Sequence, residues 1–597
     1  MGGDPGQETG SGGTPGNPSP GSGGGSPTTG SGGSVSGGSG SGSSVGSGSG
    51  GSGSGSGGSV GSGSGGAVGS GSGGSGSAGS GGQFGAKPIN LAGSPKYYRF
   101  VRLTNEQWAR SVQDVLKLTS SPGLEATFQD PVSGATDFVN NEVGLDVTQR
   151  SWGDFQTAAE TLATTVTATD AALQKVVATT DPATFIQTLG RRTYRRPLTS
   201  AEVTKYMAIH TAGSKMTGSQ SAFTKGAALV IRTMLQSPNF LYRTELGATK
   251  APLSGYEVAA KLSLWLRGTT PSDVLLDSAA GPGKLDTADG AATLAQTMLG
   301  ESTATNSLRA FHAELLQFAQ YADISKTGVA NYSAALNDEF LQTSNLFFDK
   351  VYTQGLGLKE ILTSKSGFVG PAMAKLYGVT APTSGFAERD LGATRVGYFS
   401  QIPYLALYGI NQQPDSIHRG VKINLNILCV DPGMPNFNVP PVPAPSTGLT
   451  NRETITNLTG GCGAECHGAY INPIGFAFEH FDGLGQWRDM ETVTTATAGK
   501  TMQKAVDSTG TYPFAEGTKT FAGAADLMDL IANSSQAHTC YAKKLSSFVL
   551  QRDIVASDMS LLDTLKSASM GSGGSIKQVL VNLVKHDAFR TRVGGAQ

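Results

Sequence analysis

The residues of this chain that could do chemistry gather in one short motif, Cys462-Gly-Ala-Glu-Cys466-His467. Two cysteines followed directly by a histidine are typical of a c-type haem site, because the thiols add to the two vinyl groups of the haem and the imidazole ligates its iron. The usual motif has two residues between the cysteines, whereas this one has three. We therefore expect haem c held by Cys462, Cys466 and His467, with a Cys462–Cys466 disulfide as the alternative.

An iron ligated by His467 would take its sixth ligand from elsewhere in the chain. The candidates are the thioether and imidazole side chains of Met434, Met490, Met502 and His480. A methionine would raise the reduction potential relative to a second histidine. A zinc site is less well supported, since zinc needs four ligands and no second cysteine or histidine pair lies nearby.

The segment after the motif holds two carboxylates and a cation. Glu479 and Asp482 could act as acid and base or bind calcium, and Trp487 and Arg488 could bind the haem propionates. We favour a simpler interpretation, an ion pair from these carboxylates to Arg488 that fixes the loop, because one carboxylate pair alone is a weak catalytic signal. No catalytic residue can be named from the sequence.

The other two cysteines are Cys429 and Cys540. If Cys462 and Cys466 hold haem, the pairing of Cys429 with Cys540 is the one that remains. A cross-link between residues about 110 apart would stabilise the fold by roughly 4–5 kcal/mol in the chain-entropy model, and by less in practice. The alternative is two buried free thiols, which an exported protein disfavours.

Composition separates an N-terminal segment from the rest of the chain. Residues 1–83 are almost wholly glycine and serine, which cannot bury enough apolar surface to fold, so we expect a disordered tether. Such a tether is typical of a bacterial lipoprotein just after its lipidated cysteine. We therefore expect a periplasmic or outer-surface lipoprotein whose leader is missing from this sequence. The alternative is a cytosolic protein with a disordered tail.

Charge and hydropathy limit the classes of partner that we expect this protein to bind. The formal net charge is -1, from 44 basic and 45 acidic residues, and no basic stripe points to nucleic acid. No run of 18 apolar residues could span a bilayer, so contact with a membrane would come only through an N-terminal lipid anchor.

The pattern of the remaining residues predicts a mainly α, multi-module protein. Thr104 with Gln107 and Thr199 with Glu202 form capping boxes that begin helices. Helical periodicity recurs over 154–166, 222–236, from 253, and over 291–299, 308–318, 338–352, 524–531, 540–549, 559–565 and 576–584. Strand-like alternation is scarce. Six prolines between Pro432 and Pro445 predict an extended strap before the motif.

These patterns divide the chain into a tether and five modules. The predicted segments are the tether 1–83, helical modules 95–170, 180–250 and 251–385, a cytochrome-c-like module 386–500, and a helical C-terminal module 505–597.

Several segments in this order carry a family resemblance. They are Arg102–Thr104, Tyr194–Thr199, Ser237–Arg243, Leu253–Leu266, Leu376–Gly378, His418–Gly420 and Cys462–Arg488. Over residues 96–592 the chain resembles the secreted, multi-domain proteins of planctomycetes and myxobacteria known as planctomycete cytochrome-like domains of unknown function. The resemblance implies export and a cysteine pair with histidine in the fourth module. The chain departs from the family in its cysteine spacing and in Asn472, where the family tends to have aspartate.

Together these observations predict an exported, c-type-cytochrome-like protein that transfers electrons through one haem to a redox partner protein. The alternative is a haem-free, disulfide-stabilised surface protein that binds a polysaccharide or serves as a scaffold. Whether the chain is an enzyme stays open, since the folded region has no nucleophile elbow, phosphate loop or dinucleotide fingerprint.

Overall fold

The computed structural model describes residues 87–93, 99–131, 137–433, 446–460 and 464–592. All of them belong to one compact unit, which spans residues 80–597. The predicted tether and most of the predicted proline strap lie outside the described residues, as does Cys462. None of the described helices is long and apolar enough to cross a lipid bilayer.

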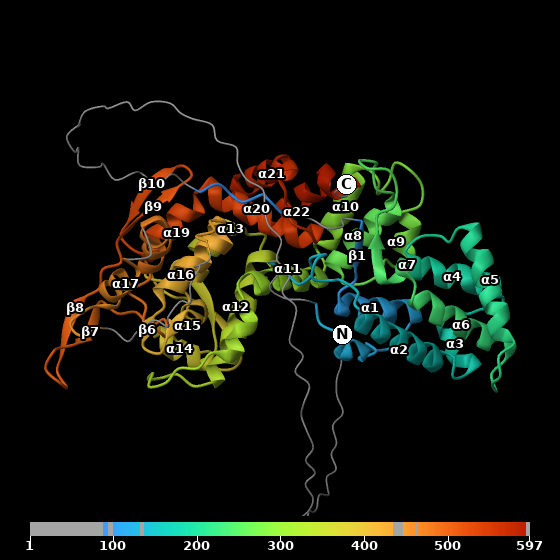
Figure 1. Cartoon of the computed structure of the whole chain (residues 1–597), viewed down its shortest axis with the longest axis horizontal. Coiled ribbons are helices and arrows are strands. Elements are labelled where there is room, and N and C mark those ends of the chain that lie inside the picture. Colours follow the sequence, from blue (N-terminus) through green and yellow to red (C-terminus); the bar gives the residue numbers. More distant parts are fainter. Residues whose placement is uncertain (1–86, 94–98, 132–136, 434–445, 461–463, 593–597) are drawn as a thin grey trace, which may run out of the picture. The chain divides into compact units, whose positions relative to one another are not determined.

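Helices dominate the described residues, as predicted (Figure 1). The first part contains β1 (Phe100–Arg102), α1 (Asn105–Leu116), α2 (Gln149–Val166), α3 (Asp170–Val176), α4 (Pro182–Tyr194), α5 (Ser200–Ser214), α6 (Ala222–Leu235), α7 (Pro238–Leu241) and β2 (Tyr242–Thr244). The next contains α8 (Gly255–Leu266), α9 (Asp273–Ser278), α10 (Ala288–Met298), α11 (Ser302–Leu315), α12 (Ala335–Thr353), α13 (Leu358–Thr363), β3 (Ser366–Val369), α14 (Pro371–Tyr377) and β4 (Ala387–Asp390).

The part that holds the motif mixes short helices with hairpins. It contains α15 (Ile402–Leu407), β5 (Gly409–Ile410), β6 (Gln413–Pro414), α16 (Ser416–Ile423), the π-helix η4 (Asn424–Leu428), α17 (Asn451–Thr459), the π-helix η6 (Ala464–Ile471), α18 (Asn472–Phe476), β7 (Met490–Thr494), β8 (Thr501–Ala505), β9 (Gly510–Phe514) and β10 (Gly517–Phe521). The C-terminal part contains α19 (Ala524–Ala532), α20 (Ser535–Leu550), α21 (Met559–Met570), α22 (Ile576–Lys585) and α23 (Asp587–Arg590).

Local sequence signals explain where many helices begin. Both predicted capping boxes are present, at the start of α1 and of α5. The same motif starts α8 at Ser254 and α17 at Thr450. The antiparallel hairpins β7–β8 and β9–β10 were not predicted. Most side chains of β8 and β10 are exposed, so these strands lack the alternation of apolar and polar residues that marks a half-buried strand.

Two hydrophobic clusters form the interior. The first lies among α1, α2, α4 and α6 and includes Trp108 and Phe155. The second is shared by residues of the three C-terminal predicted modules, from Leu253 to Phe589, and includes Tyr398. The chain segments from α8 onward therefore pack on a common core.

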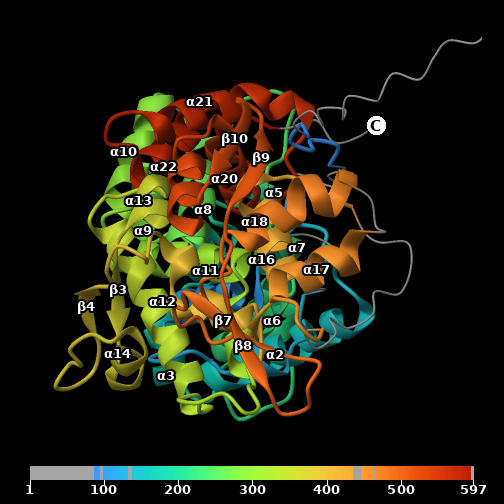
Figure 2. The ribbon, with the colours of Figure 1, turned by 90° about the vertical axis from the view of Figure 1, so that its left-hand side faces the viewer.

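The helices next to the motif cross at very short range (Figure 2). A Cβ on Gly420 of α16 would lie 2.1 Å from the carbonyl oxygen of Ile471, and one on Gly475 of α18 would lie 1.9 Å from that of Ser416. Only glycine allows backbones to approach this closely. The two glycines thus fix η6 and α18 against α16.

A buried arginine holds the turn that follows α18. Arg419 is fully buried, and its guanidinium donates five hydrogen bonds, all to backbone carbonyl groups. The acceptors are Tyr408 (2.9 Å), Phe478 (3.1 Å), Phe481 (3.0 Å), Leu405 (3.0 Å) and Asp482 (3.0 Å). Burial lowers the pKa of Arg419 to about 10. The carbonyl dipoles compensate the buried charge and tie α15 and α16 to residues 478–482.

A disulfide joins Cys429, which follows η4, to Cys540 of α20. Both residues are buried, and their Cα atoms are 5.3 Å apart. The cross-link expected between the fourth and fifth modules is thus present. It anchors the chain at the point where the proline-rich segment begins.

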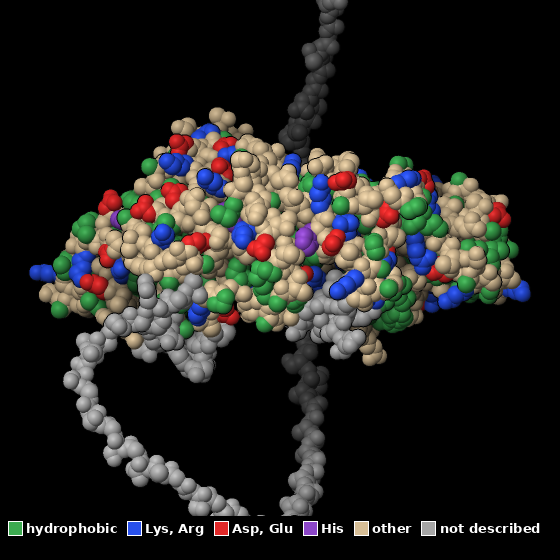
Figure 3. Space-filling view, turned by 90° about the horizontal axis from the view of Figure 1, so that it is seen from above, with side chains coloured by type: hydrophobic (Ala, Val, Ile, Leu, Met, Phe, Trp, Pro, Cys, Tyr) green, Lys and Arg blue, Asp and Glu red, His purple; other side chains and the backbone are tan. Residues whose placement is uncertain are grey.

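Positive and negative side chains intermingle on the face of the molecule shown in Figure 3. The arginines before α5 follow the same pattern of pairing. Arg191 pairs with Asp277 of α9, and Arg192 pairs with Asp273, with nitrogen and oxygen 2.9 Å apart.

Candidate functional site

The described part of the motif lies on the π-helix η6. Cys466 and His467 are both half-buried there, and Cys466 is a free thiol. The Cys466 thiol donates to the carbonyl oxygen of Pro432, with sulfur and oxygen 3.1 Å apart. The motif therefore lies against the start of the proline-rich segment.

The π geometry of η6 bears on the unusual cysteine spacing. A π-helix closes i→i+5 hydrogen bonds where an α-helix closes i→i+4 bonds, so each turn takes up more residues. In a π turn, residues i and i+4 are therefore related in space nearly as residues i and i+3 are in an α-helix. The structure describes this π geometry from Ala464 onward, so it includes Cys466 but not Cys462.

A short chain of hydrogen bonds orients the His467 ring. His467 Nδ1 lies 3.1 Å from Asn472 Oδ1, and Asn472 Nδ2 donates to Thr459 Oγ1 at 2.9 Å. Because the Asn472 amide nitrogen is used by Thr459, its oxygen faces His467, and the imidazole must donate from Nδ1. The Nε2 atom then carries the lone pair that a metal needs.

The candidate sixth ligands lie in different surroundings. Met490 and Met502 are each 46% exposed, on the β7–β8 hairpin. The His480 ring stacks on Trp487 with centroids 4.5 Å apart, and its Nδ1 lies 2.8 Å from the carbonyl oxygen of Arg488. Met434 lies outside the described residues.

The carboxylates after the motif have separate roles. Arg488 Nη2 lies 3.4 Å from Glu479 Oε2, so the expected ion pair forms with Glu479. Asp482 instead stabilises a turn, because its Oδ1 accepts the backbone N–H groups of Leu484 (2.9 Å) and Gln486 (2.8 Å).

A second buried glutamate shares Arg488, and the sequence interpretation missed it. Glu491 Oε2 lies 3.5 Å from Arg488 Nη2, and Glu491 Oε1 accepts the backbone N–H of Asn451 at 2.9 Å. Asn451 Nδ2 donates to Glu479 at 2.9 Å, and the Ser416 hydroxyl donates to the same oxygen. Burial raises the pKa of both glutamates, since one cation serves two carboxylates.

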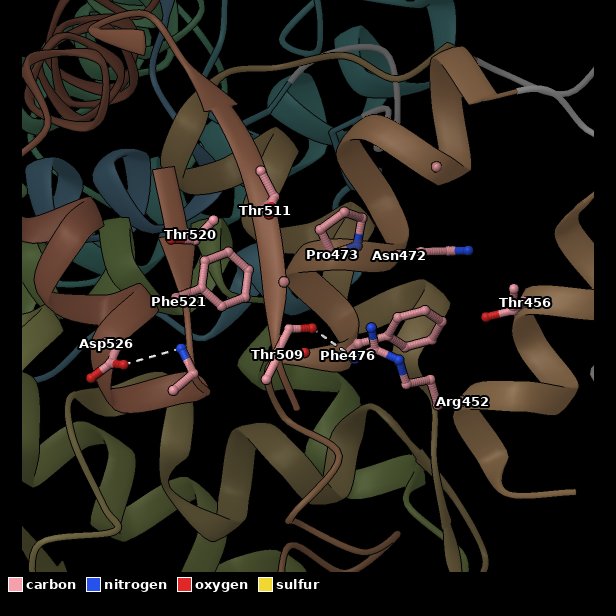
Figure 4. Close-up of a pocket in the computed structure, with 13 residues that line it drawn as sticks. Arg452, Thr456, Asn472, Pro473, Phe476, Thr509, Thr511, Thr520, Phe521 and Asp526 are labelled. Atoms are coloured by element: carbon pink, nitrogen blue, oxygen red, sulfur yellow. Dashed lines mark hydrogen bonds between the residues drawn. The ribbon is translucent and has the colours of Figure 1, made fainter. Parts of the chain in front are cut away.

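Beside the motif lies an open cavity of about 890 Å³ (Figure 4). Its walls are Arg452 and Thr456 of α17, Gly468 of η6, Asn472, Pro473 and Phe476 of α18, and Thr509, Gly510, Thr511, Thr520, Phe521, Ala522 and Asp526 around the β9–β10 hairpin and α19. These residues come from segments far apart in the sequence, so no local motif could reveal the cavity.

The donor set at the motif fits a c-type haem. A free thiol lies next to an imidazole whose Nδ1 faces the side-chain oxygen of Asn472, which leaves its Nε2 on the other side of the ring. Among the residues that the structure describes, no group of three or more histidine, cysteine, aspartate or glutamate side chains could hold a metal ion by itself.

Comparison with known families gives five matches in chain order. Each is described as a protein of unknown function: DUF1587 over residues 102–168, DUF1595 over 182–245, DUF1592 over 253–379, DUF1588 over 395–491 and DUF1585 over 517–589. The DUF1588 match contains the motif. Neither the curated proteins nor the solved structures gave a match.

Proposed function

The chain belongs to the planctomycete cytochrome-like proteins built from five consecutive domains of unknown function, and we propose that it is an exported, c-type-cytochrome-like electron-transfer protein. Cys462 and Cys466 attach one haem, and His467 provides an axial ligand. The haem supplies reversible one-electron chemistry when it is bound.

The observation that carries this proposal is the chain from His467 through Asn472 to Thr459. Metal-ligating histidines usually donate their second ring N–H to an oxygen, which fixes the tautomer and the ring orientation. Asn472 supplies a neutral oxygen here, so it orients His467 without adding negative charge next to the iron.

The cysteine spacing and the disulfide support the same proposal. Cys466 lies in the π-helix η6, and a π turn suits a three-residue cysteine spacing because it takes up more residues than an α turn. The Cys429–Cys540 disulfide fits an exported protein, because disulfides persist in oxidising compartments. We place the protein in the periplasm or on the outer cell surface, held by an N-terminal lipid anchor.

Of the candidate sixth ligands we favour Met434. It follows Pro432 by two residues, and the carbonyl of Pro432 contacts the Cys466 thiol. Met490 and Met502 are exposed, and His480 is engaged by Trp487 and Arg488. A redox partner protein would accept or deliver the electron.

The test is an absorption spectrum with a haem stain, on protein exported in a host that has c-type maturation machinery. We expect a Soret band that stays with the chain after denaturation and is absent from the Cys462→Ala/Cys466→Ala variant. The Asn472→Ala variant should keep the haem but shift its reduction potential, because the imidazole loses its acceptor. A parent protein without a Soret band would contradict the proposal.

A haem-free surface protein is the second candidate, and the polar cavity beside α17 favours it. In that case the disulfide stabilises a scaffold, and a polysaccharide or a partner protein is the ligand. Non-reducing mass spectrometry that finds Cys462 linked to Cys466 would select this candidate.

A further inference from the structure

The cavity between α17, α18 and the β9–β10 hairpin has features that neither the fold nor the haem proposal uses. Its volume of about 890 Å³ falls within the range of small-molecule sites, roughly 300–1,000 Å³. Seven of its thirteen lining residues carry polar side chains. A porphyrin needs mainly apolar walls, so this lining fits a different ligand.

Three threonines give the cavity free hydroxyl groups. The side chains of Thr456, Thr511 and Thr520 are exposed, and none of them makes a hydrogen bond to another described residue. Thr511 and Thr520 are direct cross-strand partners in the β9–β10 hairpin, so their side chains stand side by side on one face. Each hydroxyl can both donate and accept a hydrogen bond.

A cation and an anion stand on opposite sides of the cavity (Figure 4). Arg452 uses Nη1 to bond the carbonyl oxygens of Asp507 (3.1 Å) and Thr509 (2.7 Å), and its Nε lies 3.3 Å from Asp507 Oδ2 in an ion pair, while its Nη2 donates to no described residue. Asp526 accepts the Ala522 N–H through Oδ2 at 3.0 Å, and its Oδ1 accepts from no described residue. Both side chains are thus held in place, and each keeps one polar atom, Arg452 Nη2 or Asp526 Oδ1, for a ligand.

Apolar surface lies between these polar groups. The Phe476 ring carries the Arg452 guanidinium, with 4.7 Å from Cζ to the ring centroid, and Phe521 lines the hairpin side. Pro473 adds a third apolar wall. Phe476 and Phe521 are each 5% exposed, so they add only a small apolar area to the wall, and the half-buried Pro473 adds the rest.

We propose that this cavity binds a neutral oligosaccharide. A sugar ring has hydroxyls that donate and accept around its edge, which match the three threonines, and C–H faces that match Phe476 and Phe521. A neutral polyol suits these groups, because Asp507 already balances the charge of Arg452 and Asp526 keeps one oxygen as a hydrogen-bond acceptor. The site does not depend on haem, because its lining contains neither the cysteines nor His467.

The cavity nonetheless adjoins the motif through Asn472. This residue lines the cavity, and its amide oxygen holds His467. A sugar bound beside Asn472 would therefore lie directly behind the histidine.

The test is isothermal titration calorimetry of the full chain with neutral, linear hexasaccharides of glucose, mannose, galactose and xylose. We expect saturable binding of at least one of them. The Thr456→Val/Thr511→Val/Thr520→Val variant keeps side-chain shape but removes the hydroxyls, and it should bind more than about tenfold more weakly. Thr518→Val, an exposed threonine of β10 outside the cavity, is the matched control and should bind as the parent does.

The outcomes separate this inference from the haem proposal. The Cys462→Ala/Cys466→Ala variant should bind the sugar as tightly as the parent, even if the parent carries no haem. Three results would overturn the inference: no binding of any of the four sugars, equal binding by the triple valine variant, or loss of binding in the folded double cysteine variant.

Discussion

The helical region from α1 to α6 and the region from α15 to Glu491 use polar residues in different ways. In the first region a buried arginine, Arg195, donates to three backbone carbonyls, and other charged side chains pair near the surface, as Arg196 does with Glu202. In the second, Arg419 is buried on five carbonyls, and Glu479 and Glu491 share Arg488. Buried polar networks fix backbone positions more strictly than apolar contacts do. The second region therefore holds the motif in one geometry.

The largest difference between the two regions in lost unfolding free energy should come from replacing one arginine of each region by methionine. Arg419→Met removes five buried hydrogen bonds and should lower the free energy of unfolding by about 4 kcal/mol or more. Arg196→Met removes a partly exposed ion pair and should lower it by less than about 1 kcal/mol. Urea unfolding followed by circular dichroism measures both free energies. Equal losses in the two variants would contradict the difference between the two regions.

A smaller contrast is expected from adding one methyl group to a glycine in each region. Gly475→Ala would place a Cβ 1.9 Å from the Ser416 carbonyl oxygen, and overpacking of this kind should cost about 2–3 kcal/mol. Gly153 lies in α2 with nothing within 4 Å of its added Cβ. Gly153→Ala should therefore stabilise the helix by up to about 1 kcal/mol. If thermal melting shows no loss for Gly475→Ala, α16 and α18 do not cross as closely as described.

The smallest effect should be a pH dependence of opposite sign in the two regions. The hydrogen bond from Arg196 lowers the pKa of Glu202 to about 2, so its stabilising contribution is present above pH 4.5 and is lost as the pH falls toward 2. Burial raises the pKa of Glu491 above 4.5, so the folded state holds that proton longer, and stability falls as the pH rises from 4.5 through the folded-state pKa.

Glutamine variants separate the pH dependences that Glu202 and Glu491 give to the free energy of unfolding. Glu491→Gln should reduce the loss of stability above pH 4.5, to which Glu479 also contributes, and Glu202→Gln should reduce the loss below it. Free energies of unfolding measured from pH 3 to pH 8 test both. A Glu491→Gln variant with the parent's full slope above pH 4.5 would argue against a buried, proton-sharing pair.

Local signals in the sequence predicted part of this structure. Capping boxes at Thr104 and Thr199 start helices as expected, because a cap depends on residues three positions apart. The Cys429–Cys540 disulfide was expected on the condition that Cys462 and Cys466 hold haem, because four cysteines alone allow three pairings. The ion pair between Glu479 and Arg488 was also expected, since the two residues lie close in the chain.

The features that depend on distant contacts could not be predicted. The five acceptors of Arg419 come from two separate segments, so its sequence context gives no sign of burial. The π geometry of η6 depends on packing against Gly420, and the bond from Asn472 to Thr459 joins two helices. The oligosaccharide cavity likewise needs four segments to meet.

The central claim is that Cys462, Cys466 and His467 hold a haem despite the three-residue spacing. The most direct test is the intact mass of the exported chain, measured under denaturing, non-reducing conditions. The account predicts a mass increased by one haem, which disappears in the Cys462→Ala/Cys466→Ala variant. A mass without haem that is lower by the two hydrogens of a second disulfide would contradict it.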